Sequence, residues 1–150
     1  MNRLYRWYFH FNASHNMSPE DLEKKHVHTF LVNACIEVTQ MDIASQNECG
    51  DRLREYLARY RGAYLNELET FREKLPTIEG ICEVLYQDMK EIAEQHQGRL
   101  LNLEVGDSPV AMFSMGEQLL LGFTYTPVRD EDYQMYLEQW NRAGEESKQT

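Results

Sequence analysis

Three histidines of this 150-residue chain are spaced so that they can share one metal ion. His26 and His28 flank Val27 at the start of an apolar, β-branched segment that is typical of a strand. Side chains at positions i and i+2 of a strand point to the same face, so these two imidazoles emerge together. His15 follows an earlier aromatic segment, which can pair beside that strand. The spacing therefore predicts three imidazoles close together at one end of a sheet.

Three neutral imidazoles are a typical ligand set for zinc, the cofactor that we expect here. They leave one tetrahedral position open, as catalytic zinc sites do, whereas structural sites are usually closed by four protein ligands. A His-x-His pair alone is weak evidence, and the alternative is that these side chains only pack or face water. His10 and His96 have no such partner and are interpreted as surface or packing residues.

Other reactive groups and the overall charge exclude several classes of protein. The cysteines are Cys35, Cys49 and Cys82. Their odd number and the lack of a Cys-x-x-Cys motif indicate neither a disulfide framework nor a cysteine zinc site. The formal charge of −10 opposes phosphate backbones, so we expect no nucleic-acid partner. Lys24 and Lys25, beside His26, are either a local patch for a small anion or two solvated lysines.

Membrane insertion and secretion are also not expected. The sequence has no run of about 18 apolar residues, the length that a membrane span requires. Residues 1–6 lead directly into the aromatic segment and lack the apolar stretch of a signal peptide. We therefore expect a cytoplasmic protein.

The elements that must position the histidines are expected in the order strand, strand, helix, helix, strand, strand. Alternating apolar residues predict strands over 4–12, 28–39, 99–105 and 110–115. Helical spacing predicts a helix over 51–64 and another that Thr77 caps and Gly98 ends. This order predicts an α+β domain, in which an antiparallel four-stranded sheet carries two helices on one face.

A C-terminal extension is expected beyond that core. Residues 119–125 form a possible further strand, and Asp130 is placed to cap a last helix that ends at Arg142. The single domain would then cover residues 1–142. Residues 143–150 are polar and are interpreted as a flexible tail.

Five short segments together resemble a known protein superfamily. They are Phe-Asn-Ala-Ser-His-Asn-Met at 11–17, His-Val-His at 26–28, Tyr-Leu-Asn at 64–66, Pro-Thr-Ile-Glu at 76–79 and Asn-Leu-Glu at 102–104. In order, they are similar to Phe-x-Ala-Ala-His-x-Leu, His-Gly-His, the end of Asp-His-x-x-Leu-Asn, Pro-Thr-x-Glu and a strand that ends in glutamate. These are motifs of the 6-pyruvoyl- and 6-carboxytetrahydropterin synthases. The resemblance covers roughly residues 5–117 of a divergent member.

The resemblance implies the tunnelling fold, with zinc bound by His15, His26 and His28. It also implies a homo-oligomer, a trimer or a hexamer, with a pterin pocket at the subunit interface. Glu104 is then the candidate that grips the guanidine-like edge of the pterin, and Glu79 and Thr77 are further substrate-binding candidates. The alternatives are that Glu104 only faces solvent and that Glu79 only favours the helix N-terminus electrostatically.

The chain departs from the superfamily where its enzymes transfer protons. Leu22 stands where most members have a catalytic cysteine, and Arg61-Gly62 stands where they have an Asp-His pair. Neither leucine nor glycine can carry a proton, and arginine stays charged at neutral pH. The catalytic residues are therefore unknown, and the weak candidates for a base are Glu20, Glu23 and Cys49.

Two functions remain open from the sequence. The first is a zinc-binding protein that acts on or binds a pterin and, if active, is a zinc-dependent lyase-like enzyme on a dihydropterin. The second is a non-catalytic, metal-bearing oligomer that binds a pterin, a purine or a protein partner.

Overall fold

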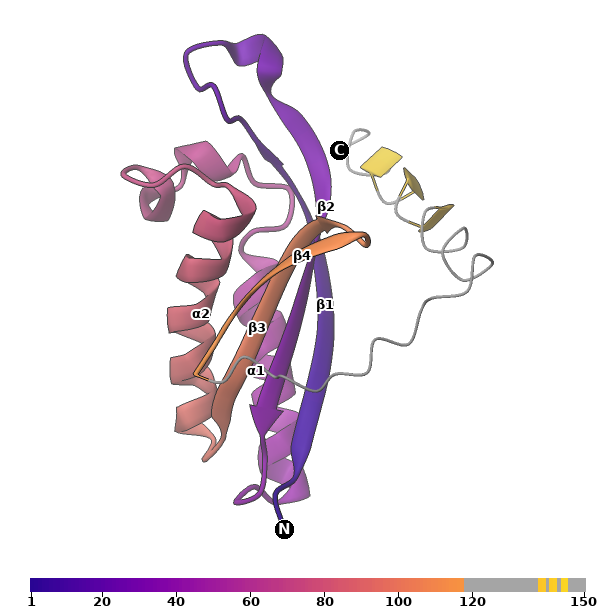
Figure 1. Ribbon diagram of the computed structural model, residues 1–150, viewed down its shortest axis with the longest axis vertical. Helices are drawn as coiled ribbons and strands as arrows, with labels where there is room; N and C mark the ends of the chain where they lie inside the picture. The colour runs from indigo at the N-terminus through magenta and orange to yellow at the C-terminus, as the bar shows by residue number, and fades with distance from the viewer. Residues whose placement is uncertain (118–137, 140, 143, 146–150) are drawn as a thin grey trace.

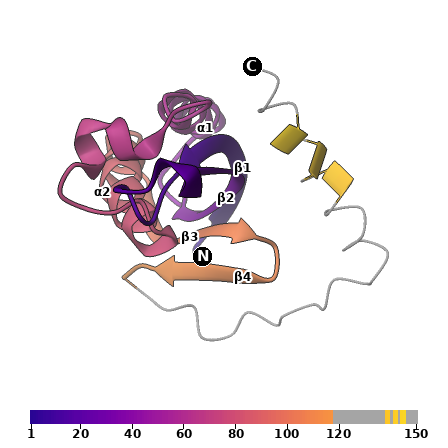
Figure 2. The same cartoon turned by 90° about the horizontal axis from the view of Figure 1, so that it is seen from above.

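Four antiparallel strands and two long helices make up the core of the chain. The computed structural model describes residues 1–117, 138–139, 141–142 and 144–145. The strands are β1 (Leu4–His15), β2 (His26–Glu37), β3 (Arg99–Ser108) and β4 (Ala111–Met115), and they lie in the order β1-β2-β3-β4. The helices α1 (Ile43–Ala58) and α2 (Ile78–Gln95) lie on the same side of the sheet (Figures 1 and 2). The predicted α+β fold is confirmed.

The core lies between that sheet face and the helices. Alternate residues of β1 and β2 point into it, and the fully buried side chains include Phe30, Val32 and Ile36. From α2, Leu85 and Met89 pack against them. Each such side chain stabilises the fold by about 1.5–3 kcal/mol when it leaves water. The same alternation continues along both strands to the histidines, so the core face of the sheet also carries the candidate site.

The β1–β2 hairpin is longer than the sequence pattern predicted. His15 was expected just past the first strand, but it is the last residue of β1 and pairs with His26, the first residue of β2. β3 pairs only with residues 31–37 of β2, so the histidine end of the hairpin extends past it (Figure 1). The connecting loop is held together by the fully buried Asn16, whose side-chain amide donates to the Asp21 carbonyl over 2.8 Å. This local bonding lets the strands pair to their ends.

A second segment braces the outer edge of β1 near the histidines. Gly62, at a φ of +72°, turns the chain after α1 and donates its N–H to the Asn12 carbonyl over 2.7 Å. Ser14 then donates to the Ala63 carbonyl and forms a parallel bridge with Tyr64. Only glycine adopts such a positive φ without steric cost. The chain thus uses Gly62, the position that aligns with the histidine of the Asp-His pair in the enzymes it resembles, for a turn.

The first helix differs most from its prediction. It was expected over 51–64, whereas α1 begins at Ile43 and ends at Ala58. Asp42 caps it by accepting from the Ser45 N–H over 2.7 Å. The first turns are polar, so their sequence lacks the apolar spacing that reveals a surface helix. The early start follows from this cap, which periodicity alone does not show.

The second helix follows its prediction closely. The Thr77 side chain accepts from the Gly80 N–H over 2.9 Å, and α2 begins at Ile78. Gly98 donates its N–H to the Ala93 carbonyl beyond the helix end. Two short 3-10 helices, η2 (Leu65–Glu67) and η3 (Glu69–Phe71), precede α2, and a third, η1 (Leu22–Lys24), lies in the hairpin loop.

The C-terminal expectations fall mostly outside the part of the chain that the structure describes. The possible strand over 119–125 and the cap at Asp130 lie there, as does most of the tail. Residues 138–139, 141–142 and 144–145 are helical. The domain limits of 1–142 and 143–150 stay a prediction.

Candidate metal centre

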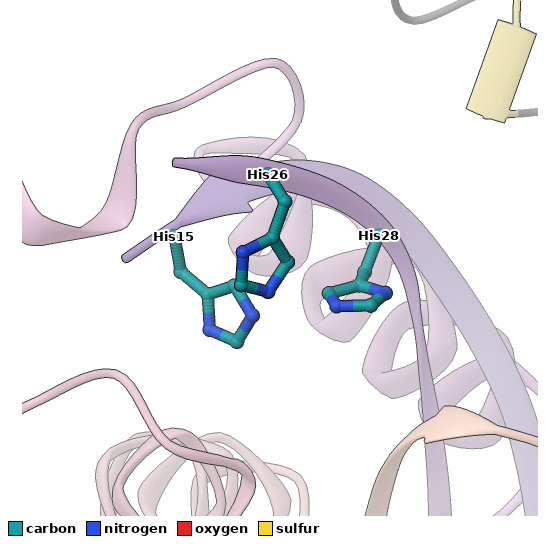
Figure 3. Close-up of side chains that lie close together, drawn as sticks. All are labelled: His15, His26 and His28. Atoms are coloured by element: carbon teal, nitrogen blue, oxygen red, sulfur yellow. The ribbon is translucent and has the colours of Figure 1, made fainter. Parts of the chain in front are cut away.

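The rings of His15, His26 and His28 converge at the end of the β1–β2 hairpin (Figure 3). Their centroids lie 4.5 Å apart for His15 and His26, 4.7 Å for His26 and His28, and 5.1 Å for His15 and His28. One nitrogen from each ring lies within 4.8 Å of the other two. The geometry can therefore hold a metal ion, because three ligand atoms at this separation can surround one ion.

Two of the rings are oriented by backbone carbonyls. Nδ1 of His15 lies 2.7 Å from the Pro76 carbonyl oxygen, and Nδ1 of His26 lies 2.8 Å from that of Lys24. A carbonyl only accepts, so each Nδ1 carries a proton, and in the neutral ring Nε2 then keeps its lone pair. Metal-binding histidines usually have their second nitrogen fixed in this way.

One ring nitrogen of His15 has no partner within the described part of the chain and could bind a cation. The residue is 4% exposed, and its Nε2 is a buried nitrogen with no hydrogen-bond partner. A buried polar atom without a partner costs about 1–3 kcal/mol. A metal ion among the three rings would satisfy this atom, so the residues present fit the zinc that the sequence predicted.

The electrostatics favour the neutral imidazoles that metal binding needs. Burial lowers the pKa of His15, and the neighbouring His26 lowers it further. Burial also lowers the pKa of His28. Because a metal competes with protons for the same lone pairs, a lowered pKa keeps these ligands available near neutral pH.

Asp107, which the sequence did not single out, stands beside the cluster. Its Oδ2 lies 3.8 Å from Nε2 of His28, and both side chains are 30% exposed. Its negative charge acts against the effect of burial on the pKa values of His15 and His28. No pattern in the sequence links an aspartate at the end of β3 to the histidines, so this contact could not be predicted from the sequence.

Glu104, the predicted pterin anchor, lies on the other face of the sheet. Its neighbours in β3, Leu103 and Val105, are in the core, whereas Glu104 lines a cavity of about 60 Å³ away from the helices. The other lining residues are Arg6, Tyr8, Asn33, Ala34, Cys35 and Asn102. Within one chain, the histidines and Glu104 are not brought together. The role of Glu104 stays a prediction.

The Pro-Thr-Ile-Glu segment, in contrast, borders the histidines. The Pro76 carbonyl holds His15, and Thr77 and Glu79 follow directly. The Thr77 hydroxyl caps α2, and Glu79 is exposed in the first helical turn. These positions are compatible with purely structural roles, in which Thr77 caps α2 and Glu79 places a negative charge at its N-terminus, and equally with substrate binding. Their binding roles therefore stay predictions.

The weak base candidates are placed differently. Glu20 and Glu23 are exposed in the hairpin loop, as is Leu22, which is 74% exposed. Cys49 is buried in α1, and burial raises the pKa of its thiol to about 11. The adjacent Gly50 packs on Trp7, eight residues before His15 on β1, a separation of about 26 Å along a strand. The structure therefore does not bring Cys49 to the histidines.

Comparison with known proteins places this arrangement in a family. No curated protein sequence matches the chain. The fold is similar to that of 6-pyruvoyl tetrahydropterin synthase from Caenorhabditis elegans, with a TM-score of 0.63 and 14% identity over 79% of this chain and 97% of that one. An uncharacterized protein from Wolinella succinogenes has a TM-score of 0.55 and 12% identity, over 79% and 99% of the two chains.

At these identities the likeness to solved structures shows the fold alone. The sequence itself matches the 6-pyruvoyl tetrahydropterin synthase family over residues 5–118, which is most of the chain and includes all three clustered histidines. Apart from Leu4, the first residue of β1, the hairpin that carries them, the four-stranded sheet and the two helices all lie within that match. The chain therefore belongs to the 6-pyruvoyl tetrahydropterin synthase family.

Proposed function

We propose that this chain binds one zinc ion through His15, His26 and His28 and binds or acts on a pterin. The observation that carries the metal proposal is the buried, unpartnered Nε2 of His15, which lies in a group of three ring nitrogens within 4.8 Å of one another. Family membership supports a pterin-related ligand.

The chain's own groups would hold and orient the reactants. When bound, zinc supplies a Lewis acid that polarises a carbonyl or hydroxyl oxygen. The carbonyls of Pro76 and Lys24 fix two of the imidazoles. Lys24 and Lys25 are exposed beside His26 and would attract an anionic group of the ligand. Glu79, or Glu104 supplied across a subunit interface, would grip the pterin through charge-assisted hydrogen bonds, which are stronger than neutral ones.

The usual proton-transfer groups are missing, so we propose that the ordinary synthase reactions are slow or absent. Leu22 cannot ionise, and Gly62 serves a turn. Loss of a positioned base typically lowers a rate by about 10²–10⁴. This observation also favours the second candidate, a non-catalytic oligomer that binds a pterin, a purine or a protein partner.

Assembly and location complete the proposal. β1 and β4 are the edge strands of the described sheet, and edges left open invite pairing with other chains. We expect a homo-oligomer, a trimer or a hexamer. The three cysteines are free and buried, as suits a reducing cytoplasm. Among the described residues, no helix is both long and apolar enough to cross a membrane.

Metal analysis of purified protein tests the proposal. Wild type should carry about one zinc per chain, and His26→Ala should lose most of it. His10→Ala is the matched control, because His10 is exposed on the same strand as His15 but on the opposite face, and it should keep its zinc. A zinc-free wild type or a fully loaded His26→Ala protein would contradict the site.

The catalytic part is tested with the zinc-loaded protein and dihydroneopterin triphosphate, with products followed by chromatography. We expect binding with little turnover. A rate of about 1 s⁻¹ or more, which is ordinary for enzymes, would show that another residue serves as the base.

A further inference from the structure

The three clustered histidines differ in the polar groups that lie next to their ring nitrogens. His15 and His26 each direct Nδ1 at a backbone carbonyl. The polar contact that the structure shows for His28 is with a carboxylate instead, since Asp107 Oδ2 lies 3.8 Å from Nε2. Asp107 is therefore a charged group next to His28, the ring of the three for which no contact with a carbonyl is shown.

A β-bulge puts Asp107 in this position. Val105 pairs with Phe113 and Ser108 with Ala111, so two residues of β3, Gly106 and Asp107, stand opposite the single Met112 of β4. Such a bulge re-aims a side chain and often lies next to a functional site. Gly106 is needed there, because a Cβ would lie 2.8 Å from the Ala111 carbonyl oxygen.

The charge of the carboxylate matters because the rings have none. A divalent cation would bring two positive charges into a site of neutral imidazoles, of which His15 is buried and His28 half-buried. A carboxylate beside the site offsets this positive charge, and such interactions are stronger where water is partly excluded.

Asp107 is not one of the three residues whose donor atoms all lie within 4.8 Å of one another. We infer that Asp107 is the carboxylate partner of the metal centre, which raises the affinity of the three-histidine site for zinc from beside the ligand set. The inference rests on the proposed zinc site and adds a positioning residue to it. A charge at this distance in a partly solvated site typically changes the affinity for a cation by about tenfold or more.

An ordinary ion pair between Asp107 and a protonated His28 predicts the opposite sign. In that case Asp107 would compete with the metal for His28. Its removal would then leave zinc affinity unchanged or increase it. The direction of the change in affinity therefore separates the two interpretations.

The experiment measures zinc affinity at pH 7 by competition with a chromophoric chelator. Asp107→Asn should bind zinc more weakly than wild type by about tenfold or more, and Asp107→Glu, which restores the charge, should recover most of the affinity. Glu94→Gln is the matched control: it makes the same change in net charge on the exposed face near the far end of α2 and should leave affinity unchanged.

The outcomes are distinct. Equal or tighter zinc binding by Asp107→Asn, with wild type binding zinc, overturns the role of Asp107 but leaves the proposed site. Failure of wild type to bind zinc overturns both. Thermal unfolding of the metal-free proteins shows whether Asp107→Asn folds as wild type does. If it does not, zinc affinity is compared between Asp107→Ala and Asp107→Glu. Weaker binding by Asp107→Ala supports the role of Asp107, and equal or tighter binding overturns it.

Discussion

Hydroxyl and carboxylate groups between the two helices show how single residues join elements far apart in sequence. The Tyr56 hydroxyl of α1 donates to the Asp88 carboxylate of α2 and lies 3.0 Å from the Tyr60 hydroxyl. Burial, with the hydrogen bond to Asp88, raises the pKa of Tyr56 and keeps it protonated as a donor. Unlike Nε2 of His15, these groups have hydrogen-bond partners within the chain, which favours a structural role.

Tyr56→Phe should therefore weaken the fold. The change removes a donor to Asp88 and the partner of the buried Tyr60 hydroxyl, at a cost of about 1–3 kcal/mol in the free energy of unfolding. Tyr8→Phe is the control, because Tyr8 is 68% exposed and its change should stay within about 0.5 kcal/mol. Urea unfolding of both variants checks this. If Tyr56→Phe is as stable as Tyr8→Phe, water fully replaces the hydrogen bonds of the Tyr56 hydroxyl.

Among the elements, the β3–β4 hairpin links stability to the metal centre through its bulge. At Gly106 a Cβ would clash with Met112 Sδ and would also lie close to the backbone of β4. Methionine can move, but the backbone oxygen cannot do so without shifting the strand. The bulge and the position of Asp107 thus depend on one glycine.

Gly106→Ala should cost about 1–3 kcal/mol of unfolding free energy, as overpacking typically does. Gly144→Ala is a suitable comparison, because no atom lies within 4 Å of its added Cβ. Thermal unfolding of the two variants measures the difference. A Gly106→Ala protein as stable as Gly144→Ala would mean that the hairpin accommodates the methyl group, and the bulge would then not require glycine.

For the molecule as a whole, buried thiols make stability depend on alkaline pH. Burial raises the pKa of Cys49 to about 11 and that of Cys82 to about 12, from an ordinary value of 9.0. Above pH 9 the unfolded chain loses these protons and the folded chain keeps them. The stabilising effect is thus complete below pH 9 and is lost as the pH rises toward 11–12.

Urea unfolding under reducing conditions should show this loss between pH 8 and pH 10.5. Each thiol should contribute about 2 kcal/mol to the fall at pH 10.5, since one pKa unit corresponds to about 1.4 kcal/mol. In Cys49→Ala, the decrease in unfolding free energy between pH 8 and pH 10.5 should be smaller than in wild type by the contribution of one thiol. This expectation does not depend on how the substitution changes stability at pH 8. An identical pH dependence in the two proteins would exclude Cys49 as a contributor.

Local patterns in the sequence predicted the elements whose signals are themselves local. Thr77 and Gly98 mark the ends of α2 because caps act within one turn. The start of α1 at Ile43 was missed because its cap precedes a polar stretch without helical apolar spacing. The strand order followed from alternation, although both strands of the first hairpin reach further toward the histidines than alternation indicated.

The sequence by itself determined that His26 and His28 share a strand face, because two-residue spacing fixes the direction of side chains. Only the tertiary structure decided that His15 pairs opposite His26, that its Nε2 is buried without a partner, and that Asp107 reaches His28. These facts depend on register, a bulge and burial, which arise when segments distant in sequence pack together, and no local pattern encodes them.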